Sequence, residues 1–135
     1  MDFKPVDLNS YTRYWLDEYA TILFRNKNDE RIIQELRQQS SETTQHSEQE
    51  IASLIAQLSA RESRYNLCRI MIEVFAAAWD ELSMKEQALL EAIHRRGLTR
   101  TEAIAELSIE LNCSESTVRR HYRKALQRFQ KLFVG

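Results

Sequence analysis

A single unbroken run of apolar positions constrains this chain more than any other feature. From Ile51 to Leu82, residues that are apolar with one exception recur at alternating spacings of three and four positions. The positions are Ile51, Leu54, Leu58, Arg61, Tyr65, Cys68, Ile72, Phe75, Trp79 and Leu82. This heptad spacing keeps one face of a helix apolar and is typical of a long helix packed against another at a shallow angle. The run predicts a long packing helix over residues 47–82, which Ser47 and Glu50 begin as a capping box.

The helix that packs against this seam belongs either to a second copy of the chain or to the same chain. In the second case, residues 9–38 would fold back as an antiparallel hairpin. The aromatic residues at seam positions 65, 75 and 79 suit both arrangements about equally. We expect a homodimer through residues 51–79, with the hairpin as the alternative.

The residues before the seam predict one further helix and a linker. Residues 9–38 carry an apolar stripe at helical spacing, capped by Asn9 or Ser10, with a break near Asn26–Asp29 as an open alternative. The stripe consists of Tyr11, Trp15, Tyr19, Ile22, Leu23, Ile32, Ile33 and Leu36. Residues 38–46 contain no apolar side chain and are expected to form a linker. The chain is therefore divided into an N-terminal segment and linker (1–46), a connecting helix (47–82) and a C-terminal domain (83–135).

The C-terminal domain shows the start and stop signals of three short helices. Ser83 with Glu86 and Thr99 with Glu102 are capping boxes, and Gly97 suits the end of the first helix. The whole chain holds only 2 glycines and 1 proline, the residues on which tight turns and hairpins depend. We therefore expect an all-α fold.

The segment 106–129 has the residue types of a helix-turn-helix. Asn112 tolerates the left-handed backbone of a tight turn, Cys113 is small enough to pack there, and Ser114 caps the following helix. Inward positions are expected at Leu107, Leu111, Val118, Ala125, Leu126 and Phe129. The outward positions of the last helix are Glu115, Ser116, Arg119, Arg120, Arg123 and Lys124. A helix fits the major groove of DNA, and its outward residues in the first turns meet base edges.

Charge is distributed unevenly along the chain. The net charge of −1 combines a balance of −5 over residues 1–81 with +4 over residues 82–135. Residues 112–135 hold six Lys and Arg residues against Glu115 alone. Clustered positive charge on one segment points to a polyanion as partner. Lys and Arg near a helix end also stabilise the helix dipole, which accounts for Arg128 and Lys131 without DNA.

This segment resembles region 4 of sigma-70-type factors over about 50 residues, Glu81 to Lys131. The stretch ELNCSESTVRRHYRKALQRF also resembles the C-terminal end of the ArpU family of phage-type transcriptional regulators. The resemblance implies DNA contact by Glu115, Ser116, Arg119 and Arg120, and phosphate contact by Ser114, Arg123 and Lys124. The sequence departs from the pattern at Asn112, where glycine is more usual, and at Glu115, where a basic residue often stands.

The leading expectation is a sequence-specific double-stranded DNA-binding transcription regulator, a late-gene activator of a phage or prophage. One alternative is a small-terminase-like DNA-packaging protein, although such proteins usually carry their DNA-binding bundle at the N-terminus. Another is a helical adaptor that binds RNA polymerase or an anti-sigma partner. RNA polymerase is also a candidate partner of the regulator itself.

Other classes of function lack the residues that they need. The longest apolar run, 74–79, is far short of the roughly 20 residues of a membrane span. The N-terminus has no secretory signal, so we expect a cytoplasmic protein with Cys68 and Cys113 as reduced, buried thiols. The three histidines lack partners at metal-ligand spacing, and no acid/base pair or phosphate loop is present. We expect no metal, no cofactor and no catalysis.

Overall fold

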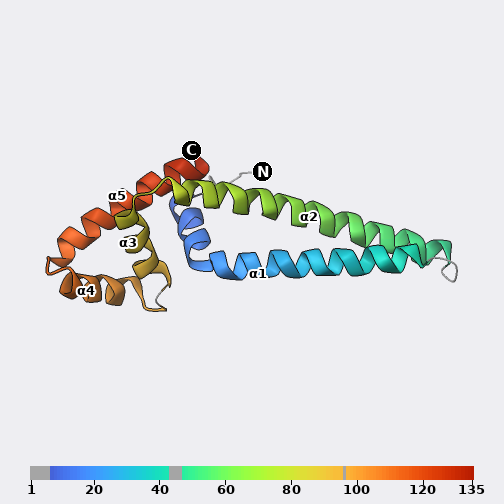
Figure 1. Ribbon diagram of the computed structural model, residues 1–135, viewed down its shortest axis with the longest axis horizontal. Coiled ribbons are helices and arrows are strands. Elements are labelled where there is room, and N and C mark those ends of the chain that lie inside the picture. The colour runs from blue at the N-terminus through green and yellow to red at the C-terminus, as the bar shows by residue number, and fades with distance from the viewer. Residues whose placement is uncertain (1–6, 43–46, 96) are drawn as a thin grey trace, which may run out of the picture. The chain divides into compact units, whose positions relative to one another are not determined.

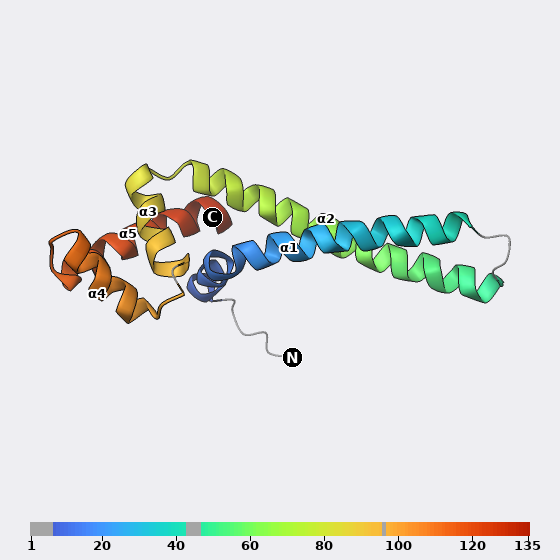
Figure 2. The same ribbon diagram turned by 60° about the horizontal axis from the view of Figure 1, so that its bottom comes forward.

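The computed structural model describes residues 7–42, 47–95 and 97–135, and within these ranges every regular element is a helix. The elements are α1 (Leu8–Ser41), α2 (Glu48–Asp80), α3 (Met84–Arg95), α4 (Arg100–Glu110) and α5 (Glu115–Val134). Figures 1 and 2 show them in chain order. The predicted all-α fold is confirmed for these residues.

The chain divides into two compact units, and the division falls within α1 and α2. The first unit combines Met1–Tyr19 with Val74–Gly135, and the second is Ala20–Glu73. The first unit therefore contains the first turns of α1, the last turns of α2 and all of α3, α4 and α5.

The second unit is an antiparallel hairpin, in which α1 and α2 lie side by side (Figures 1 and 2). Ile22, Ile33 and Leu36 of α1 are buried, and the seam positions of α2 in this unit are half-buried. Buried Asn26 donates from Nδ2 to the carbonyl oxygen of Tyr65 at 3.2 Å. In the single chain, this part of the α2 seam thus packs against α1, which is the hairpin alternative. The homodimer stays a prediction.

Ion pairs explain why a charged residue occupies the seam. Asp29 of α1 accepts from Arg61 at 3.3 Å and from Arg64 at 2.8 Å. Arg37 is paired with Glu62 at 2.7 Å further along the hairpin. Because Arg61 has a carboxylate opposite it, its place in an otherwise apolar row is compatible with packing.

The bounds of α1 and the burial of the two cysteines differ from the sequence-based expectations. The helix begins after Asp7, whose Oδ1 accepts from the backbone N–H groups of Asn9 and Ser10, so neither of those residues is the cap. It runs unbroken through 26–29, since Asn26 is held by Tyr65 and Asp29 by two arginines. It also continues to Ser41, where the side chain bonds back to the carbonyl of Gln38; the rest of the expected linker, 43–46, lies outside the described residues. Both cysteines are free, but they are half-buried rather than buried.

The core of the first unit is aromatic. Phe75 is 1% exposed and lies at the centre of five ring contacts. It stacks on Tyr19 with ring centroids 4.2 Å apart and meets Phe129 edge-on at 5.0 Å. Trp15, Trp79 and Phe133 complete the set. These contacts join the ends of α1 and α2 to α5, and so fix the surface that α5 presents.

Candidate nucleic-acid interface

A turn of residues 111–114 joins α4 to α5 and is closed by backbone hydrogen bonds. Asn112 has φ 52, the left-handed conformation expected of it. The amide of Cys113 donates to the carbonyl of Ser108 at 3.0 Å, which satisfies one of the last carbonyls of α4. Ser114 then caps α5 by accepting from the amide of Thr117 at 3.1 Å. The predicted turn and cap are confirmed.

The two capping boxes that precede this turn also form: one shows both of its hydrogen bonds, and the other shows the bond to its cap. Ser83 and Glu86 bond reciprocally, backbone to side chain, at 2.9 and 3.2 Å. Thr99 accepts from the amide of Glu102 at 3.2 Å and caps α4. Gly97 has φ 71, as a residue after a helix end requires.

The inner face of α5 is buried along its whole length. Its buried residues are Val118, Tyr122, Ala125, Leu126, Phe129 and Phe133. Leu107 of α4 is also buried, as expected. Leu111 was expected inside and is 59% exposed, because it is the cap residue at which the chain leaves α4 and turns into the left-handed Asn112. That one inward assignment is wrong.

The residues predicted to meet DNA lie on the opposite side of α5, with one exception. Glu115, Ser116, Arg120, Arg123 and Lys124 are exposed, and Ser114 is exposed at the N-terminus of the helix. Among the described residues, no carboxylate lies within ion-pair distance of Arg120, Arg123 or Lys124. These three cations therefore form an outward row without internal neutralisation.

Arg119 is the exception, since it lies at the edge of this row. Its side chain is 44% exposed, and its Nη2 lies 3.7 Å from Glu115 Oε2 one turn earlier. A pair this long between two half-exposed side chains is weak. Glu115 thus holds Arg119 along the helix surface without burying it.

Arg128 contacts other parts of the chain and does not belong to the outward cationic row. Its guanidinium donates to the carboxylate of Glu86 and, at 3.1 Å, to the carbonyl oxygen of Glu81. It therefore ties α5 to the loop before α3. From its position in the sequence, Arg128 is expected to stabilise the helix dipole, and the structure instead shows contacts with Glu86 and Glu81.

Tyr122, His94 and Asp17 form a hydrogen-bonded chain that was not predicted from the sequence. His94 Nδ1 lies 2.6 Å from Asp17 Oδ1, and His94 Nε2 lies 2.8 Å from the hydroxyl of Tyr122. Burial lowers the pKa of His94 below its ordinary value of 6.5, and Arg100 and Arg13 lower it further, against the opposing effect of Asp17. Neutral His94 then donates a hydrogen bond from Nδ1–H to Asp17 and accepts one at Nε2 from the hydroxyl of Tyr122.

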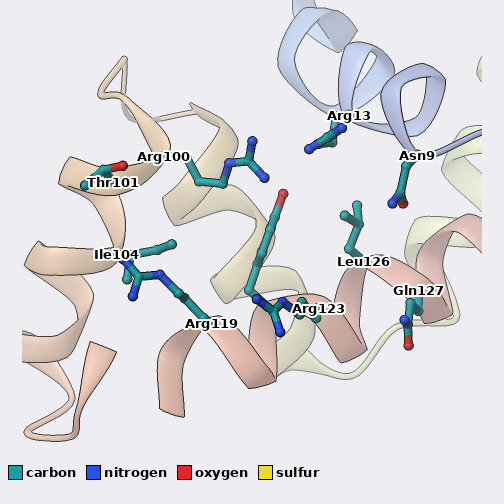
Figure 3. A pocket seen from close by; sticks show the side chains of 10 residues that line it. Asn9, Arg13, Arg100, Thr101, Ile104, Arg119, Arg123, Leu126 and Gln127 are labelled. Atoms are coloured by element: carbon teal, nitrogen blue, oxygen red, sulfur yellow. The ribbon is translucent and has the colours of Figure 1, made fainter. Parts of the chain in front are cut away.

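Two hollows flank α5 in the first unit. One, of about 490 Å³, lies between the start of α1, the start of α4 and α5, and four arginines line it (Figure 3). The other, of about 810 Å³, lies between α3, the end of α4 and α5, and its lining includes Leu89, Leu107 and Leu111. Arg13 and Arg100 of the first hollow were missed as candidate binding residues because nothing in the sequence shows that the starts of α1 and α4 meet.

Comparison with known proteins gives no relative: no family model matches the chain, and no curated protein or solved structure matches it either. In the part of the chain that the structure describes, no group of three or more His, Cys, Asp or Glu residues could hold a metal ion. No helix in the same part is long and apolar enough to cross a membrane.

Proposed function

We propose that this chain is a sequence-specific regulator of transcription that binds double-stranded DNA, and that it has no catalytic activity of its own. In this proposal α4 and α5 act as a helix-turn-helix. α5 enters the major groove with Glu115, Ser116, Arg119 and Arg120 toward base edges. Ser114, Arg123 and Lys124 contact the backbone phosphates.

The observation that carries the proposal is the unpaired cationic row on α5. Arg120, Arg123 and Lys124 are exposed and have no carboxylate partner among the described residues, while the other side of the helix is buried in the core. A helix anchored on one side and positively charged on the other fits a groove between two phosphate backbones. The capped N-terminus at Ser114 adds backbone N–H groups and the positive end of the helix dipole.

The resemblance to sigma region 4 and to the ArpU family supports the more specific proposal of a phage or prophage activator. The order of two short helices and a longer one after α2, with a tight turn before the last, is compatible with that resemblance. In such an activator the N-terminal half would bind RNA polymerase or a second copy. Because the seam of α2 packs within the chain, a homodimer through residues 51–79 would use other side chains, such as the exposed Leu67 and Ile70.

A helical adaptor that binds a protein is the second candidate, and one observation favours it. The hollow beside α3 is bordered by Leu111, and Ile109 on the same helix end is 80% exposed. Exposed apolar residues around a hollow are typical of surfaces that bind other proteins. The same hollow is also lined by Lys124, a proposed phosphate contact, so a protein bound there would compete with DNA for that side chain.

The test measures binding of the full chain to a duplex of about 30 base pairs with random sequence, over a series of salt concentrations. Phosphate contacts release counterions, so the affinity should fall steeply and linearly in log–log form as salt rises. Selection from a random-sequence duplex library would then identify the operator. Failure to bind any duplex at low salt would contradict the proposal and favour the adaptor.

A further inference from the structure

Four arginines from three helices surround one hollow in the first unit. Arg13 comes from α1, Arg100 from the start of α4, and Arg119 and Arg123 from α5 (Figure 3). The hollow measures about 490 Å³ and is also lined by the polar side chains of Asn9, Thr101 and Gln127 and by the ring of Tyr122.

The positive charge of this hollow is not balanced by the residues that line it, and the carboxylate of Asp17 lies with Arg13 and Arg100 around a neighbouring hollow. No carboxylate lines the hollow of the four arginines itself. Within the described ranges, Arg13, Arg100 and Arg123 form no ion pair, and Arg119 has only its 3.7 Å contact with Glu115. Like charges that converge without a counter-charge repel one another, and an anion between them relieves that repulsion.

Two features act on Arg100. Arg100 is the first residue of α4, directly after its cap Thr99, so the positive end of the helix dipole lies beside its side chain. The hydroxyl of Tyr122 donates to His94 Nε2, which leaves its oxygen free to accept from the neighbouring Arg100 guanidinium.

We propose that this hollow is a phosphate-binding site, with Arg13 and Arg100 as ligands in addition to the residues of α5. Guanidinium groups bind phosphate oxygens through paired, charge-assisted hydrogen bonds. The source of the phosphate is the DNA backbone next to the groove that α5 enters, and to that extent the inference rests on the proposed function. A free phosphorylated molecule offers the same chemistry, and the experiment separates the two sources.

The experiment compares Arg13→Gln and Arg100→Gln with the wild-type chain and with Arg25→Gln. Arg25 is exposed, it is not among the residues that line the hollow, and its substitution removes the same charge. The first assay measures affinity for a random-sequence duplex against salt. Each hollow variant is expected to reduce the slope of log affinity against log salt by about one, and Arg25→Gln to leave it unchanged. The second assay titrates inorganic tripolyphosphate into each protein by calorimetry.

The two assays together decide the source. A smaller slope of log duplex affinity against log salt in both hollow variants supports a phosphate of the DNA backbone. Loss of tripolyphosphate binding with duplex binding intact supports a free phosphorylated ligand at the same site. If charge is the cause, Arg13→Lys and Arg100→Lys should retain part of the salt dependence or part of the tripolyphosphate binding that the glutamine variants lose. Circular dichroism checks that each variant is folded.

The inference and the proposed function fail in different ways. If the wild type binds duplex and both hollow variants behave like Arg25→Gln in both assays, the phosphate site is refuted and DNA binding stands. If the wild type binds tripolyphosphate through the hollow but no duplex, the site stands and the proposed function is refuted. If it binds neither, both are refuted.

Discussion

Asp17 on α1 lies 2.6 Å from Nδ1 of His94 on α3, and the two residues are 77 positions apart in the chain. The other ring nitrogen of His94 meets the hydroxyl of Tyr122 on α5 at 2.8 Å. One imidazole therefore connects three helices of the first unit. Since burial lowers the pKa of His94, this connection is made by a neutral ring.

The first prediction is that stability falls as the pH drops below the ordinary histidine pKa of 6.5. In that range unfolded chains bind a proton at residue 94 that the folded chain does not bind, so the free energy of unfolding decreases until the folded pKa has been passed. The measurement is the thermal midpoint between about pH 7.5 and pH 5.5, above the range in which most carboxylates titrate. His94→Gln should show a shallower decrease. His121→Gln, at an exposed site, should decrease like the wild type; equal slopes in all three proteins would contradict the argument.

The second prediction concerns the aromatic core. Phe75→Ala should lower the free energy of unfolding by about 3–5 kcal/mol, because it removes a fully buried ring and leaves a cavity among the surrounding rings. Urea denaturation followed by tryptophan fluorescence measures this, since Trp15 and Trp79 both adjoin Phe75. Phe24→Ala is the matched control: that ring is 73% exposed, and its loss should change stability by less than about 0.5 kcal/mol. A similar cost for both would mean that the ring cluster contributes no special stability.

Local signals in the sequence predicted the parts of the fold that depend on neighbouring residues. The caps at Ser83, Thr99 and Ser114 each use a side chain and an amide three positions apart, so residue type and spacing determine them. The left-handed Asn112 was predictable for the same reason. The outward position of Arg120 followed from helical periodicity, because the apolar residues of this segment predict which face of α5 is buried.

Contacts between distant residues were not predictable in this way. Nothing near Arg61 shows that Asp29 will lie opposite it, although that pair helps to explain why the hairpin forms in the single chain. Nor does any spacing bring Arg13 to Arg100, or Asp17 to His94. These contacts depend on how helices pack, and a helix pattern specifies which face is buried without specifying its partner.

The third prediction addresses the turn before α5. Asn112→Ala should destabilise the protein by about 1 kcal/mol, since an alanine Cβ is strained at φ 52 and lacks the polar side chain that makes this conformation accessible to asparagine. Asn112→Gly should stay within about 0.5 kcal/mol of the wild type, because glycine adopts this conformation without strain. Chemical denaturation of the two variants in parallel measures the difference. Equal stability of the alanine and glycine variants would show that the turn relaxes to another conformation.

The last prediction separates the two kinds of contact proposed for α5. Arg119→Ala and Arg120→Ala should each cost about 1–3 kcal/mol of discrimination at one base position, because each removes a donor aimed at a base edge. Lys124→Ala should weaken binding to operator and random duplex alike and reduce the salt dependence by about one phosphate contact. Competition between operator and random duplex, measured by fluorescence anisotropy over a series of salt concentrations, gives both quantities.

The position of Arg119 makes this test stringent. Arg119 contacts Glu115 at 3.7 Å and also lines the arginine-lined hollow. It could therefore contact either a base or a phosphate. Arg120 has no such neighbour and projects from the outward face of α5. A specific loss for Arg120→Ala together with a uniform loss for Arg119→Ala would therefore move Arg119 from the base-reading set to the phosphate set. Uniform losses for both variants would mean that α5 binds DNA without reading its sequence, and the regulator proposal would then fail.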